Sequence, residues 1–234
     1  AMLKDGKILP GTLISDIPLN INGFTPRNYN RDFQGAVPAR TAIEKSLNVP
    51  LVRMLSEYGT GRFLALLKKT GMTTLPFPEE HYGATLILGG AEGTLWDMSG
   101  IYASLARVLN HYRPYNGRYR KKDIHALTVF PGQKEKYPIL SPGDSRLTDQ
   151  PLLSAAAIWF AFEAMSGLNR PEEEADWQQF KSMKKIAWKT GTSYGNRDAW
   201  AIGVTPRHVV GIWVGNASGE GRPGLTGVGE AAPI

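Results

Sequence analysis

The sequence Lys189-Thr190-Gly191-Thr192-Ser193 lies at the end of an expected strand and precedes two apolar, β-branched runs. A lysine supplies positive charge, threonine hydroxyls donate hydrogen bonds, and a glycine lets a ligand come close to the backbone. Together these groups can hold a small anionic group. The motif therefore predicts both a strand and a binding site for an anion at the end of that strand.

The residues around this motif predict an antiparallel sheet. Apolar runs occupy about 185–192, 198–204 and 208–215. They are separated by Gly195-Asn196 and by Thr205-Pro206-Arg207, which are connections of hairpin length. We therefore expect three consecutive strands that pair in chain order.

The residues before this sheet read as loops and helices. Residues 1–38 are rich in Pro, Asn and Gly, which is typical of extended, loop-rich chain. Apolar spacing, prolines at helix starts and glycines at helix ends then predict helices over 38–47, 52–58, 61–69, 97–110 and 154–165. Helices followed by an antiparallel sheet indicate an α+β fold.

Charge and cysteine content narrow the classes of function. The net charge is +6, but Lys and Arg form no stripe interleaved with aromatic residues, so we expect no nucleic-acid partner. The absence of cysteine excludes disulfides and thiolate metal sites, and the four histidines lack a metal-binding spacing. We expect no metal and no other cofactor. No apolar run is long enough to span a bilayer.

A second motif precedes the first by about 140 residues. Ser46-Leu47-Asn48 lies directly before Val49-Pro50, where a plain interpretation is that the asparagine and proline end a helix. Penicillin-binding proteins and serine β-lactamases, however, share the motifs Ser-x-x-Lys, Ser-x-Asn and Lys-Thr-Gly in that chain order. The combination with Lys189-Thr190-Gly191 favours this second interpretation.

The resemblance covers nearly the whole chain. The segments that resemble the transpeptidase domain of class A penicillin-binding proteins are 33–40, 46–50, 88–95, 189–195, 198–203, 210–215, 225–227 and 231–233. The resemblance implies one domain over residues 1–234 with the α+β penicillin-binding transpeptidase fold, which is similar to that of the serine β-lactamases. It implies peptidoglycan D,D-transpeptidation, in which a serine attacks a stem peptide and passes the acyl group to an amine. β-Lactams would bind the same site.

Roles for the catalytic residues follow from the resemblance alone. Ser46 would relay protons in the cleft, and Asn48 would bind the amide of the donor peptide. Lys189 would supply positive potential and contact the Ser46 hydroxyl. These residue types suit acyl transfer, because a nucleophilic serine needs proton relays close by.

Roles for the substrate-binding residues follow in the same way. Thr190 and Thr192 would bind the terminal carboxylate beside Gly191, with Ser193 assisting. The backbone N–H of Thr192 would form half of the oxyanion hole.

The first motif of the set is missing in its expected place. No Ser-x-x-Lys precedes Ser46, and the match at Ser182-Met183-Lys184-Lys185 is in the wrong order, so we interpret it as chance. The resemblance implies that the nucleophile and two strands of the sheet lie upstream of Ala1, as would a glycosyltransferase domain and a membrane anchor. We expect the protein to be located in the periplasm or on the extracytoplasmic face of the bacterial inner membrane. We expect the printed chain alone to be inactive and to self-associate through an exposed edge strand.

Two other classes remain open, and several weaker signals are set aside. One alternative is a non-catalytic scaffold or peptide-binding module that keeps the fold; the other is a β-lactamase, for which we find no base to activate water.

The Gly-x-Gly-x-x-Gly match at 219–224 lacks the context of a dinucleotide site. We interpret Trp159, Phe160 and Phe162 as core residues, Asp198 and Trp200 as structural, and Glu92 as stabilising a turn.

Overall fold

A computed structural model describes residues 1–129, 140, 143–167 and 185–234. Its C-terminal part is the expected antiparallel sheet. The strands are β5 (Ala187–Thr192), β6 (Asp198–Val204) and β7 (Val209–Gly215), in the order β5-β6-β7. The prediction of three consecutive strands is therefore confirmed, with bounds within two residues of those expected.

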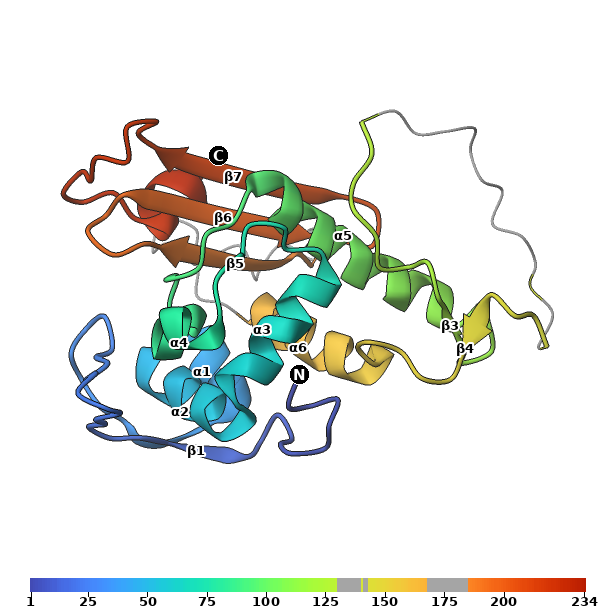
Figure 1. The fold of residues 1–234 in the computed structure, drawn as a ribbon, viewed down its shortest axis with the longest axis horizontal. Helices are drawn as coiled ribbons and strands as arrows, with labels where there is room; N and C mark the ends of the chain where they lie inside the picture. The colour runs from blue at the N-terminus through green and yellow to red at the C-terminus, as the bar shows by residue number, and fades with distance from the viewer. Residues whose placement is uncertain (130–139, 141–142, 168–184) are drawn as a thin grey trace.

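Helices cover the two faces of this sheet unequally. α5 (Leu95–Tyr112) and α6 (Ala155–Ser166) pack on one face, and a single helical turn (Gly227–Ala231) packs on the other (Figure 1). Small residues of β6, Ala199 and Ala201, are buried under that turn. Because side chains alternate along a strand, successive residues of β5 alternately face the helices α5 and α6 and the turn at Gly227–Ala231.

Four further helices precede α5 and form the other half of the molecule (Figure 1). They are α1 (Ala39–Glu44), α2 (Asn48–Tyr58), α3 (Thr60–Thr70) and the short α4 (Glu79–Tyr82), which continues into a 3₁₀ turn over Gly83–Ile87. The expected start of α2 at residue 52 was wrong, because Pro50 lies within its first turn. A proline is tolerated there, since the first N–H groups of a helix have no partner within it.

Two short strand pairs were missed. β1 (Leu13–Asp16) pairs with β2 (Gly35–Pro38) within the segment expected to be loop, and β3 (Tyr119–Arg120) pairs with β4 (Leu147–Thr148). Pairs of two to four residues are too short to show periodicity. Residues 182–184 of the Ser-x-x-Lys match lie outside the described residues.

The interpretation of two aromatic residues as core was wrong. Trp159 and Phe160 of α6 are 55% and 42% exposed, whereas Phe162 is partly buried and stacks on Tyr102 of α5 at 6.5 Å between ring centroids. The sequence of α6 is apolar on all sides, so periodicity could not show which side the rest of the described chain covers.

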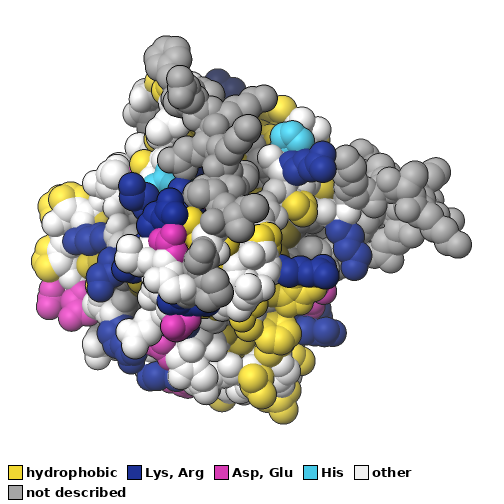
Figure 2. All heavy atoms as spheres, turned by 90° about the vertical axis from the view of Figure 1, so that its right-hand side faces the viewer, with side chains coloured by type: hydrophobic (Ala, Val, Ile, Leu, Met, Phe, Trp, Pro, Cys, Tyr) yellow, Lys and Arg dark blue, Asp and Glu magenta, His cyan; other side chains and the backbone are white. Residues whose placement is uncertain are grey.

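The described surface is mixed in charge. On the face turned to the viewer in Figure 2, Lys and Arg side chains lie in several separate groups with Asp and Glu between them. Among the described residues, no helix combines the length and the apolar character needed to cross a bilayer.

Candidate active site

The fold brings the two sequence motifs into direct contact. Lys189 of β5 and Ser46, between α1 and α2, are 143 residues apart, yet Nζ of Lys189 donates a hydrogen bond to Oγ of Ser46 at 2.5 Å. The same ammonium group donates to the backbone carbonyl of Thr190 at 2.8 Å. The contact expected between Lys189 and the Ser46 hydroxyl is therefore present, while the catalytic roles of both residues stay predictions.

Ser46 has an unusual backbone conformation. Its φ is +52°, in the left-handed region that residues with a Cβ rarely adopt. The chain turns sharply here, because the N–H of Ser46 donates to Ile43 and the N–H of Leu47 donates to Ala42. This turn ends α1 and directs the Ser46 hydroxyl toward β5.

Burial changes the acidity of Lys189. Desolvation lowers the pKa of its ammonium group from 10.5 to about 8, because a buried site disfavours the charged form. At neutral pH the group still carries its proton. A small rise in pH therefore converts Lys189 from a cation into a neutral amine, which can accept a proton from Ser46.

Asn48 lies at the first residue of α2. Its side-chain amide nitrogen donates to the backbone carbonyl of Arg27 at 2.8 Å. This bond fixes the orientation of the amide, since the nitrogen must face Arg27 and the carbonyl oxygen then points away from it.

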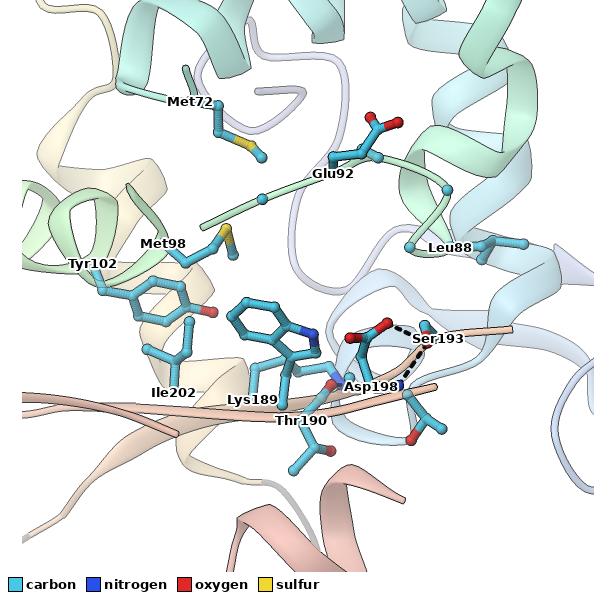
Figure 3. A pocket seen from close by; sticks show the side chains of 17 residues that line it. Met72, Leu88, Glu92, Met98, Tyr102, Lys189, Thr190, Ser193, Asp198 and Ile202 are labelled. Carbon is cyan, nitrogen blue, oxygen red and sulfur yellow. Dashed lines mark hydrogen bonds between the residues drawn. The ribbon is translucent and has the colours of Figure 1, made fainter. Parts of the chain in front are cut away.

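The expected substrate-binding threonines lie on the opposite face of β5 from Lys189. Side-chain alternation places Lys189 on the α5 side, and Thr190 and Thr192 on the side of the C-terminal turn. Figure 3 shows Lys189 and Thr190 on opposite sides of the strand. Gly191 and Thr192 are exposed. Among the described strands, β5 pairs only with β6, so its other edge has no strand partner there.

A glycine far along the chain holds Thr192. The N–H of Gly227 donates to Oγ1 of Thr192 at 3.0 Å, which leaves the hydroxyl proton for donation to an anion. The backbone comes so close here that a Cβ at residue 227 would lie 2.4 Å from the carbonyl oxygen of Gly191 and 2.6 Å from that of Trp200.

We therefore expect Gly227→Ala to destabilise the protein by about 1–3 kcal/mol, because backbone atoms cannot move aside as a flexible side chain can. Urea unfolding measures this change. Gly11→Ala is the matched control, since a Cβ there meets nothing within 4 Å. Equal unfolding midpoints for the two variants would show that the C-terminal turn is not packed on β5 in solution.

Ser193 is held by a neighbouring carboxylate. Its hydroxyl donates to Oδ2 of Asp198 at 2.8 Å and accepts from the N–H of Asp198 at 2.9 Å (Figure 3). The indole of Trp213 donates to the other oxygen of Asp198 at 2.9 Å. These bonds agree with the structural role predicted for Asp198. The assistance of Ser193 in substrate binding stays a prediction.

A cleft of about 560 Å³ lies between β5 and the glycine-rich turn at 88–93. Residues 189–193 line one side of it, and apolar side chains line much of the rest (Figure 3): Met72, Met98, Tyr102, Trp200 and Ile202. Burial raises the pKa of Tyr102 to about 12, so this phenol stays protonated. Of these five residues, the sequence indicated Trp200 as structural and Met98 and Tyr102 as apolar positions of the helix expected over 97–110, but none of them as lining a site. The alternation of β6 could also have indicated Ile202.

No metal site accompanies this cleft within the described part of the chain, where no group of three or more His, Asp or Glu side chains is suited to hold an ion. The Glu92 backbone accepts a hydrogen bond from Oγ1 of Thr74 at 2.6 Å, which ties the glycine-rich turn to the segment after α3. This bond uses the backbone of Glu92 and not its carboxylate, so the interpretation that Glu92 stabilises the turn stays a prediction.

Solved structures show the class of fold. The structure of penicillin-binding protein 1A from Haemophilus influenzae matches 94% of this chain and 37% of its own with a TM-score of 0.65 at 18% identity. The PonA1 protein of Mycobacterium tuberculosis in complex with penicillin V matches 97% of this chain and 62% of its own with a TM-score of 0.65 at 20% identity. The fold is therefore the α+β fold of penicillin-binding-protein transpeptidase domains, as expected.

Sequence comparison adds particular relatives. The chain is 34% identical over 232 residues to penicillin-binding protein 1C of Escherichia coli, and 29% identical over 229 residues to penicillin-binding protein 1B of Vibrio cholerae. These matches cover 99% and 95% of this chain, but 26% and 27% of the relatives. The chain is a homologue of penicillin-binding proteins 1C, 1B and 1A and spans about a quarter of their length. No family model matches it.

Proposed function

We propose that this chain supplies part of the active site of a D,D-transpeptidase that cross-links peptidoglycan stem peptides by serine acyl transfer. The contact between Lys189 and Ser46 carries the proposal, because it joins the two motifs across 143 residues. The homology to penicillin-binding proteins supports it.

Each group at the site has a part in this reaction. The nucleophilic serine attacks the carbonyl of the donor D-Ala-D-Ala bond, the last D-Ala leaves, and an amine then takes the acyl group. Ser46 passes the proton to the leaving amine, with Lys189 hydrogen-bonded to its hydroxyl. Asn48 binds the donor amide, and the hydroxyls of Thr190 and Thr192 bind its terminal carboxylate.

The nucleophile itself is proposed to lie outside the printed sequence. The single Ser-x-x-Lys match, at 182–185, follows Ser46 in the chain, whereas the motif set places it before. We place the reaction on the periplasmic face of the bacterial inner membrane, because peptidoglycan is assembled there. β-Lactams would acylate the same serine.

A non-catalytic scaffold with the same fold is the second candidate. Such a protein would keep the cleft and the open edge of β5 for binding stem peptides, and it would form no acyl intermediate.

Intact mass after incubation with a penicillin separates these functions. We expect the full natural protein to gain the mass of one penicillin and the printed chain alone to gain none. No gain in either form would favour the scaffold. Acylation of the printed chain would instead place the nucleophile among its own serines, with Ser46, Ser182 and Ser193 examined first.

We also propose that the printed chain self-associates through β7. Among the described strands, β7 pairs only with β6, and its Val210 and Trp213 are 58% and 38% exposed. An apolar strand edge of this kind invites pairing with a second copy. We expect the apparent mass in light scattering to rise with concentration, and Val210→Lys to reduce that rise. A monomer at millimolar concentration would exclude the association.

A further inference from the structure

Two polar side chains, Asp16 and Asn28, lie buried behind the Ser-x-Asn motif (residues 46–48). Asp16 is 0% exposed and Asn28 is 2% exposed. A buried carboxylate is costly unless hydrogen bonds satisfy it, so its partners show what its burial achieves. Neither residue belongs to the motifs that the proposed function uses.

Asp16 is fixed at the end of β1, where it pairs with Gly35 of β2. Its Oδ1 accepts a hydrogen bond from the side-chain amide of Asn28 at 2.8 Å. Its Oδ2 accepts one from the backbone N–H of Gln34 at 2.9 Å. Both carboxylate oxygens are therefore occupied by donors, and one donor is Asn28.

The carboxylate determines how the Asn28 amide is turned. A carboxylate can only accept, so the amide nitrogen of Asn28 must face Asp16, and it also donates to the carbonyl of Asp32 at 2.8 Å. The amide oxygen then faces α2 and accepts from the backbone N–H of Val49 at 3.2 Å. Leu47, the residue that precedes α2, provides no side-chain cap. Asn28 caps this helix from 21 residues away.

Arg27, which precedes Asn28, binds Asn48, which precedes Val49. The carbonyl of Arg27 accepts from the side-chain amide of Asn48 at 2.8 Å. Two consecutive residues, Arg27 and Asn28, thus hold two consecutive residues, Asn48 and Val49. Asp16 anchors this arrangement to the β1–β2 pair.

We infer that Asp16 and Asn28 are positioning residues: their hydrogen bonds orient the start of α2, and thereby Asn48 and Ser46, for acyl transfer. The inference rests on the proposed function, because it assigns these two residues to the same site. Neither residue contacts Lys189 in any described hydrogen bond, so they act through the motif and not on the reacting atoms.

The test compares acylation by a fluorescent penicillin in variants of the full natural protein. Asn28→Asp turns a carboxylate toward Asp16, and we expect the acylation rate constant to fall about 10- to 100-fold. Asp16→Asn replaces one of the two acceptor oxygens with a donor, so it cannot accept from both Asn28 and Gln34, and it should lower the rate constant similarly. The double variant Asp16→Asn with Asn28→Asp restores a donor and an acceptor between residues 16 and 28 but leaves the Asp32 carbonyl without its donor, so it should recover part of the rate. Asn30→Asp, an exposed change on the same loop, is the matched control and should leave the rate unchanged.

The end point of acylation separates positioning from stability. A positioning role lowers the rate constant while the whole sample is still acylated. A role in stability alone lowers the fraction that can be acylated and leaves the rate constant unchanged, and that result would overturn the inference. If Asn28→Asp does not fold, Asn28→Ser removes the amide cap without a second charge and should lower the rate constant in the same direction.

A failure of the proposed function would look different. The unaltered protein would then not be acylated at all, and hydrogen exchange of residues 46–52 would decide the inference independently. Faster exchange there in Asn28→Asp and Asp16→Asn, but not in Asn30→Asp, would support it. Equal exchange in all three would overturn it.

Discussion

Replacing Lys189 with methionine in the full natural protein should lower the rate constant of acylation by penicillin about 10³-fold. The change removes the positive charge beside the cleft and the hydrogen bond from Nζ to Oγ of Ser46, while a side chain of similar length still fills the space. Without this partner the Ser46 hydroxyl loses its proton relay. The rate is measured with a fluorescent penicillin under single-turnover conditions.

Lys185→Met is the control for this experiment. Lys185 lies just before β5 and is exposed, so its substitution removes the same charge from the same segment without touching the site. We expect an unchanged rate for that variant. A Lys189→Met protein that is acylated as fast as the unaltered protein would exclude Lys189 from the reaction.

The second large effect concerns stability and pH. Burial lowers the pKa of Lys189 to about 8 in the folded protein, against 10.5 when the group is unperturbed. Between these two pH values the unfolded chain binds a proton that the folded protein has lost, so raising the pH favours the folded state. We expect Lys189 to contribute about 3 kcal/mol to this rise in the free energy of unfolding across that interval.

Urea unfolding between pH 7 and pH 10.5 measures this contribution as a difference between two proteins. The unaltered protein should gain stability relative to Lys189→Met as the pH rises above 8, because other groups titrate alike in both. Lys185→Met should behave as the unaltered protein does. A constant difference at every pH would mean that the pKa of Lys189 is not lowered by folding.

Stability and the affinity for penicillin should therefore change in opposite directions around pH 8. The same deprotonation that favours the folded state removes the positive charge that Lys189 supplies to the cleft. We expect the affinity for the anionic penicillin to decrease over the interval in which the protein becomes harder to unfold.

Sequence patterns predicted the parts of this fold that repeat along the chain. The strands β5, β6 and β7 were found because β-branched residues and hairpin-length connections mark them clearly. α5 was found from apolar spacing and α6 from its apolar, alanine-rich composition, although only packing could show that Trp159 and Phe160 face outward. The contact of Ser46 with Lys189 was expected only from the resemblance, since no local pattern joins residues so far apart.

Sequence patterns could not predict the residues that support the site through non-local contacts. Asp16 and Asn28 are single polar residues in a loop-rich segment, and nothing in their neighbours distinguishes a buried pair from an exposed one. Gly227 lies among many glycines, and its contact with Thr192 depends on how the C-terminal turn packs on the sheet. Non-local hydrogen bonds of this kind become visible only when the chain is folded.

The left-handed backbone of Ser46 has a consequence for genetic selection at this position. Glycine and asparagine accept a positive φ most readily, whereas a β-branched residue resists it. In a library of all substitutions at residue 46, abundance of folded protein should favour glycine and asparagine. Threonine keeps the hydroxyl but strains the turn. Ranking the substitutions by cell survival and by protein abundance should therefore give different orders. The difference separates the requirement for the Ser46 hydroxyl from the requirement for a residue that accepts a positive φ.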